Sequence, residues 1–122
     1  MKFKILDLNK ETINNRIYPT KVVEEAINSP IIQELLQCGG IPIEDKRDIN
    51  LKELDTININ NVIGFAKKLY IEDDSLYVEA TNLIEGKNLV DISFYASGEI
   101  HFDDNNLIQT YMEIDKSVGE QE

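Results

Sequence analysis

The sequence predicts an α+β fold, with one or two short helices near the N-terminus packed on an antiparallel β-barrel or half-barrel. Apolar residues at helical spacing occur before Gly39-Gly40. After these glycines, apolar residues alternate with polar ones in short segments separated by turn residues, which is typical of antiparallel strands. We expect closure into a barrel or half-barrel because closure protects the strand edges.

The first forty residues predict one strand, one loop and two helices. Alternating apolar and polar residues indicate a strand over residues 2–8, and the polar residues 9–18 indicate a loop. Pro19 fits the first turn of a helix, where its missing N–H costs nothing. Ser29-Pro30 is a second helix start, and Gly39-Gly40 ends that second helix.

The rest of the chain predicts strands and turns. The charged residues 44–55 are expected to form a mobile surface loop, and Gly64 is expected to mark a bulge within a strand. Residues 1–115 are assigned to a single domain and residues 116–122 to a frayed polar tail. The predicted strands cover residues 57–71, 76–80, 89–95, 99–102 and 107–114, with turns at 73–75, 96–98 and 105–106.

Composition argues against nucleic-acid-binding and membrane-spanning proteins. Twelve basic and 23 acidic residues give a net charge of −11, which argues against direct binding of nucleic acid. No apolar run approaches the roughly 18 residues of a membrane span, so we expect a soluble, intracellular domain. Cys38 is the single cysteine and is expected to be a small buried hydrophobe. The acidic stretches 44–48 and 103–104 lack the pattern of a calcium loop, so neither a metal nor a cofactor is predicted.

The segment Asn14-Asn15-Arg16-Ile17-Tyr18-Pro19, followed by an apolar helical face, resembles the opening of the prohead core proteases of tailed bacteriophages. These enzymes are similar in fold to the herpesvirus assembly proteases. Weaker resemblances follow in order at residues 39–45, 61–80 and 90–95, so the likeness covers roughly residues 2–100. Residues 90–95 resemble the strand that carries the nucleophilic serine in these enzymes. Within the opening segment we expect structural roles in anchoring the loop, and these are assigned to Asn15, Arg16, Tyr18 and Pro19.

The sequence departs from the family at the position of the catalytic histidine. The resemblance places that histidine in the segment matching residues 40–46, where this chain has Glu44 and Asp45 instead. A serine hydroxyl needs an adjacent base, and a carboxylate with an ordinary pKa near 4 is a weak one. The resemblance therefore implies an inactive protease fold serving as a phage virion structural protein, such as a capsid auxiliary, decoration or scaffold component.

Two alternative functions remain open. If residues 96–98 form a tight turn, Ser93 and His101 lie directly across a hairpin with Cβ atoms roughly 4.5–5.5 Å apart. Asp91 lies on the same face of the hairpin, so these three residues could form a Ser–His–Asp contact. The first alternative is therefore an active prohead assembly serine protease. The competing interpretation is that this face of the hairpin is simply polar and solvated. The second alternative is a host-cell protein interaction module.

The expected partners are capsid or other virion proteins in a symmetric assembly, with no membrane contact. This places the protein in the virion, assembled in the host cytoplasm. The strand over residues 107–114 is predicted to be an open sheet edge that could accept a strand from a neighbour. Its predicted interaction residues are Leu107, Gln109 and Tyr111.

Overall fold

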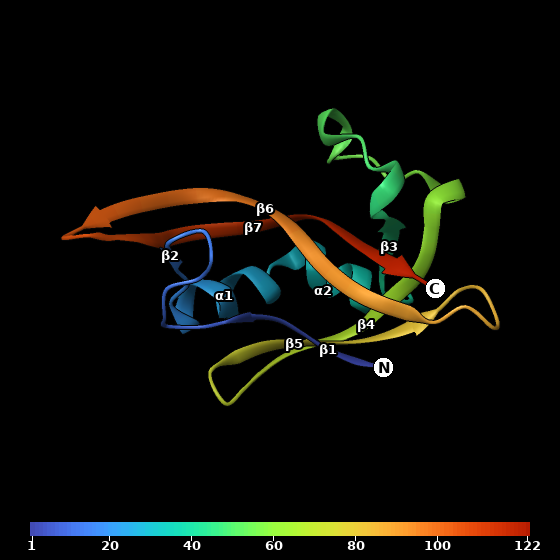
Figure 1. Cartoon of the computed structure of the whole chain (residues 1–122), viewed down its shortest axis with the longest axis horizontal. Helices are drawn as coiled ribbons and strands as arrows, with labels where there is room; N and C mark the ends of the chain where they lie inside the picture. Colours follow the sequence, from blue (N-terminus) through green and yellow to red (C-terminus); the bar gives the residue numbers. More distant parts are fainter.

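Seven strands and two α-helices make up the computed structural model, which describes residues 1–122. Helices α1 and α2 lie between the β6–β7 pair and the part of the sheet formed by β1, β5 and β4 (Figure 1). The strands are β1 (Lys2–Asp7), β2 (Arg16–Ile17), β3 (Ile41–Asp45), β4 (Val62–Glu72), β5 (Ser75–Asn82), β6 (Leu89–Asp103) and β7 (Asn106–Gln121). The helices are α1 (Thr20–Ile27) and α2 (Pro30–Gln37), with short 3₁₀ turns η1 (Lys46–Asp48), η2 (Leu51–Glu53) and η3 (Ile59–Asn61).

The strands form one curled sheet in the order β1-β5-β4-β3-β7-β2, and β6 pairs with the other edge of β7. Neighbours β1 and β5, β5 and β4, β4 and β3, and β6 and β7 are antiparallel. Strand β7 is parallel to both β2 and β3. The predicted α+β half-barrel is therefore confirmed, and its sheet is mixed rather than wholly antiparallel.

Both helices form close to where the sequence predicts them. Pro19 is the N-cap of α1 rather than its first helical residue, and its carbonyl accepts the Val22 N–H at 3.1 Å. Ser29 caps α2, with Pro30 in the first turn. Gly40 has φ +116°, which favours glycine, and its N–H donates to the α2 carbonyl of Leu35. Neither helix is long and apolar enough to span a bilayer.

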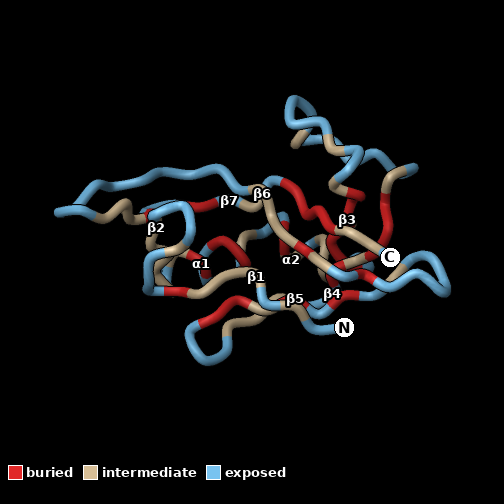
Figure 2. The backbone as a smooth tube through the Cα atoms, viewed as in Figure 1, coloured by how far each residue is buried: buried red, intermediate tan, exposed pale blue.

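Two apolar clusters fill the space between the helices and the sheet. The first joins α2 to strands β3, β4, β5 and β6, and the second joins α1 to β5 and β7; Figure 2 shows buried backbone concentrated around the helices. The first cluster contains Ile32, Ile41, Ile43, Ile63, Ala66, Val78, Ala80, Leu89 and Ile92. The second contains Leu8, Val23, Ala26, Ile27, Leu76 and Met112.

The β4–β5 hairpin follows local turn chemistry. Asp73 and Asp74 both have positive φ, at 49° and 59°, which suits the tight turns of β-hairpins. The β3–β4 register shifts between Ile43 and Glu44, whose partners are Gly64 and Val62, as the predicted bulge requires. A Cβ on Gly64 would lie 2.5 Å from the Thr81 carbonyl oxygen, so the strands can approach here only with glycine.

Two sequence-based expectations about the C-terminal third are wrong. Residues 96–98 form no turn, because β6 continues through them and the chain reverses only at Asp104-Asn105. Gly98 instead lets β6 lie close to the Tyr111 carbonyl and the Gln109 side chain. The expected frayed tail is part of β7, and its Val118 side chain is 1% exposed because that segment pairs with β6 and β3.

Candidate functional site

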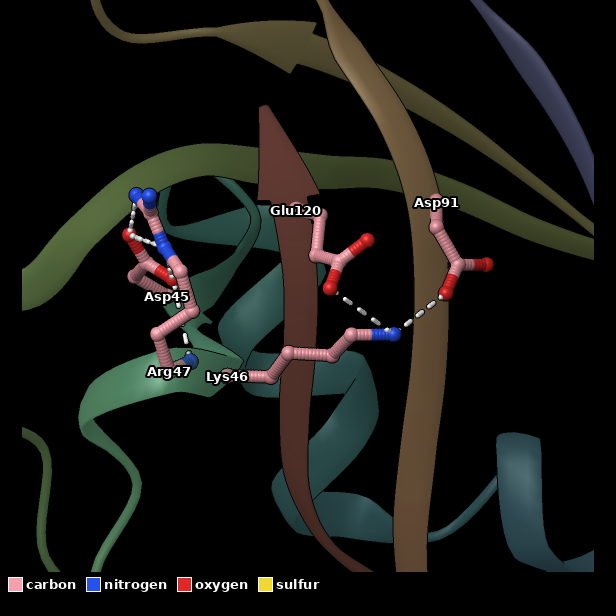
Figure 3. A network of polar contacts seen from close by, with 5 residues as sticks. All are labelled: Asp45, Lys46, Arg47, Asp91 and Glu120. Atoms are coloured by element: carbon pink, nitrogen blue, oxygen red, sulfur yellow. Dashed lines mark hydrogen bonds and ion pairs between the residues drawn. The ribbon is translucent and has the colours of Figure 1, made fainter. Parts of the chain in front are cut away.

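A lysine links three elements at one end of the sheet. Lys46 begins η1 directly after β3, and Figure 3 shows its side chain crossing β7 toward β6. Its Nζ lies 2.8 Å from Asp91 Oδ2 and 3.5 Å from Glu120 Oε1. Asp91 and Glu120 are register partners on β6 and β7, where two facing carboxylates would repel each other. The positive charge of Lys46 offsets the repulsion between the Asp91 and Glu120 carboxylates.

The same contacts limit the chemistry of Lys46. The hydrogen bond to Asp91 is the main cause that raises the pKa of Lys46 above its ordinary value, and the nearby charges of Asp91 and Glu120 act in the same direction. The amine is protonated near neutral pH, as an ordinary lysine is, and these contacts favour that state, so it does not take a proton from a serine hydroxyl. This cluster is an ion-pair network that joins the strands.

Asp45 and Arg47 form a second ion pair beside the first (Figure 3). The Asp45 carboxylate is 5% exposed, accepts the Arg47 backbone N–H at 3.0 Å and also contacts the guanidinium group. The side-chain hydrogen bond from Arg47 is the largest of the effects that lower the pKa of Asp45. Asp45 therefore stays ionised as the N-cap of η1, with no reactive group as its partner.

Glu44 and Lys116 form a further ion pair, which is buried. Glu44 Oε2 and Lys116 Nζ are 2.7 Å apart, and each side chain is 5% exposed. Lys116 also donates to the Glu53 carbonyl at 2.9 Å, while Glu44 accepts the Asn58 N–H at 3.3 Å. Residues 44–55 are therefore tied to the sheet at several points, and the expectation of a mobile surface loop is wrong at Glu44 and Asp45, which are buried.

The structure does not bring Ser93 and His101 together. Ser93 pairs with Val118, whereas His101 pairs with Ile108 near the hairpin tip. The two residues lie eight positions apart on one continuous strand, which is about 26 Å at 3.3 Å per residue. Asp91 lies near Ser93 on β6 but is bound to Lys46. The cross-strand triad proposed from the sequence therefore does not form.

The residues of the Asn-Arg-Ile-Tyr-Pro motif join the N-terminal loop to the body. Asn15 is exposed with φ 60°, in the left-handed region that asparagine tolerates, and turns the chain into β2. Arg16 pairs with Leu107 of β7, and the Tyr18 side chain packs against the second apolar cluster. Pro19 is the N-cap of α1, and the anchoring roles expected for these four residues stay predictions.

The expected interaction strand lies inside the sheet, and only part of one of its edges is open. Strand β7 pairs with β6 along one edge, and β2 covers the other edge at Leu107 and Ile108, so the predicted open edge exists only over residues 109–114 on the side away from β6. Gln109 is 4% exposed and its Nε2 donates to the Tyr111 carbonyl at 2.6 Å. Only Tyr111 of the three expected interaction residues is exposed. The outer edge of β6 has no strand beside it.

Sequence reasoning missed Lys46, Lys116 and Glu120 because each acts through a partner distant in sequence. Val118 was the available signal, since a valine inside the polar segment 116–122 indicates a buried position. No group of three or more His, Cys, Asp and Glu side chains in residues 1–122 is arranged to hold a metal ion. Cys38 is exposed at the end of α2, contrary to the expectation of burial.

Comparison with known proteins agrees with the fold. No protein-family model matches the chain, and no curated protein sequence matches it. Among solved structures, the capsid assembly protease gp21 of bacteriophage T4 matches with a TM-score of 0.70 and 14% sequence identity. The match covers 97% of this chain and 80% of the T4 protein. The prediction of a prohead-protease-like fold is confirmed at the level of the fold.

Proposed function

We propose that this protein is a non-catalytic structural component of a phage capsid or prohead, built on the fold of a capsid assembly protease. The observation that carries the proposal is the ion-pair network of Lys46, Asp91 and Glu120. It occupies the end of β3 and the β6 strand, where the sequence resemblance places the catalytic histidine and serine. Paired charges lie at this place instead of a histidine base.

The chemistry of serine proteolysis supports this interpretation. A serine nucleophile requires a base within hydrogen-bond reach and a third group to orient that base. Lys46 is held protonated, and His101 lies on the exposed part of the β6–β7 hairpin, far along the strand from Ser93. Neither group can serve Ser93 in this arrangement.

The proposed partner is a virion protein with a basic patch, contacted within a symmetric assembly. The distal part of the β6–β7 hairpin, residues 96–111, extends beyond α1 and is largely exposed (Figures 1 and 2). Phe102 and Ile100 on this hairpin are 64% and 39% exposed, and β6 has no strand on its outer edge. A net charge of −11 favours a basic partner and faster association at low salt.

The test combines proteolysis and binding. We expect that the protein neither reacts with a serine-directed fluorophosphonate probe nor cleaves the major capsid protein of the same phage, but that it sediments with that capsid protein. Phe102→Ser should weaken co-sedimentation, whereas Val90→Ser, at a half-exposed residue outside the hairpin tip, should not. Labelling that is lost in Ser93→Ala would contradict the non-catalytic role. Absence of co-sedimentation would contradict the structural role.

A further inference from the structure

One edge of β7 is left open in the middle of the sheet. Strand β6 pairs with β7 from Asn106 to Gln121, so β2 and β3 must share the opposite edge. On that edge β2 pairs with residues 107–108 and β3 with residues 117–119. Residues 109–116 therefore have no strand beside them. The open edge has room for a strand of about six residues, or about 20 Å at 3.3 Å per residue.

A groove of about 1150 Å³ runs along this open edge. Residues 111–115 of β7 line one side, α1 and the start of α2 line another, and the η2 region over residues 51–55 completes it. Three apolar side chains at the groove are unusually exposed, with exposed fractions of 65% for Ile31, 63% for Leu51 and 47% for Tyr111. These side chains offer apolar contacts beside unpaired main-chain groups, the combination that strand addition uses.

The charges around the groove are mostly negative. Carboxylates from three elements line it, and Lys52 is the one cation among the lining residues. Tyr111 donates a hydrogen bond to Glu113 at 2.6 Å, which holds these two side chains together at the groove. The acidic lining residues are Glu25, Asp55, Glu113 and Asp115.

We infer that this groove binds an extended cationic peptide segment, which adds to the open edge of β7 as a strand between the positions of β2 and β3. Main-chain hydrogen bonds to residues 110–115 would hold the segment, and the carboxylates would select lysine or arginine side chains. A second copy of this chain fits poorly because each copy carries a net charge of −11. The inference goes beyond the proposed capsid role and does not depend on it.

The test uses the full chain and a fluorescein-labelled peptide of alternating lysine and valine. We expect saturable binding by fluorescence anisotropy, weakened by added salt, together with slower amide hydrogen exchange over residues 110–115. Glu25→Gln and Glu113→Gln should each weaken binding about twofold to fivefold, as expected for single exposed charge pairs. The matched control is Glu85→Gln, which makes the same charge change at an exposed residue outside the groove and should leave affinity unchanged.

Two altered peptides separate strand addition from general attraction. A peptide of alternating glutamate and valine should not bind. A lysine–valine peptide with N-methyl groups on alternate residues keeps its charge but lacks strand donors, and it should bind much more weakly. Equal binding of the methylated peptide, equal loss in the Glu85→Gln control, or failure of the lysine–valine peptide to bind would overturn the inference.

Discussion

The Glu44 carboxylate and the Lys116 ammonium lie 2.7 Å apart, almost entirely out of contact with solvent. Burial of an ion is costly unless a partner and further hydrogen bonds compensate it. Here Asn58 donates to Glu44, and Lys116 donates to the Glu53 carbonyl. These contacts fix the segment after β3 against β7, so two residues hold together parts of the chain that are far apart in sequence.

Removal of the lysine from this pair should be strongly destabilising. We expect Lys116→Met to lower the free energy of unfolding by about 3–5 kcal/mol, because it leaves a buried carboxylate without its ion partner. The double variant Glu44→Gln with Lys116→Met should be more stable than Lys116→Met alone. Urea denaturation at pH 7 measures both, with the exposed Lys87→Met as the control. A cost below about 1 kcal/mol for Lys116→Met would mean that the pair is not formed.

Asp45 should make stability depend on pH in the acid range. The pKa of Asp45 in the folded state lies below the ordinary value of 3.8. Its contribution to the free energy of unfolding is therefore fully present above pH 3.8 and is lost as the pH falls through the lower pKa of the folded state. Asp45→Asn should cost about 1–3 kcal/mol at pH 7, and the difference from the parent should shrink below pH 3.8. Denaturant unfolding across this range checks the prediction. The control is Asp103→Asn at an exposed hairpin residue, which should change the free energy of unfolding by less than about 0.5 kcal/mol at pH 7.

Gly98 shows how a single element can be misread from its local sequence. The run Ala96-Ser97-Gly98 has the composition of a turn, yet it lies within the fifteen residues of β6. Glycine is needed there because the Tyr111 carbonyl and the Gln109 side chain occupy the space of a Cβ. A glycine that permits close packing and a glycine that permits a turn are identical in sequence.

A substitution at this glycine distinguishes the two roles. Gly98→Ala should lower the free energy of unfolding by about 1–3 kcal/mol, because the added methyl group meets main-chain atoms of β7 that cannot move aside easily. Ser97→Ala, at the adjacent exposed position, should change it by less than about 0.5 kcal/mol. Thermal and urea unfolding measure both variants. Equal stability of the two variants would favour a turn over a continuous strand.

Elements with local signals were predictable from the sequence. The two helices follow from their proline start signals and apolar spacing, and the β4–β5 hairpin follows from Asp73-Asp74. The C-terminal half of β7 was not predictable, because residues 116–121 become a strand through pairing with β6 and β3. The ion-pair network was not predictable for the same reason, since Lys46, Asp91 and Glu120 meet only in the folded sheet.

At the scale of the whole molecule, the fold class was predictable and the mixed sheet was not. Local patterns favour hairpins, so a sequence interpretation assumes antiparallel pairs. The parallel contacts of β7 with β2 and β3 join segments separated by most of the chain. The residue patterns and the need to protect strand edges led to the correct half-barrel, but they carried no information on how the charged residues of this chain pair.

The net charge of −11 should make the whole fold sensitive to ionic strength. A rise in NaCl from about 0.01 M to about 0.1 M shortens the screening length from about 30 Å to about 10 Å and weakens self-repulsion in the folded state. We expect the Tm at pH 7 to increase by a few degrees, as measured by circular dichroism. The double variant Glu79→Gln with Glu85→Gln, which carries less negative charge, should show a smaller increase. A Tm that falls with salt would mean that attractive ion pairs dominate.

The position of β7 in the sheet also sets an order of events for a chain emerging from the ribosome. Strands β1, β4 and β5 can pair with one another before β7 is synthesised, whereas β2 and β6 pair only with β7. Closure of the second half of the sheet must therefore wait for residues 106–121, and such non-local pairing is slow. During that interval the edges of β3 and β6 are open to strands of other nascent chains. The time window before β7 pairs is when this protein is most prone to aggregate.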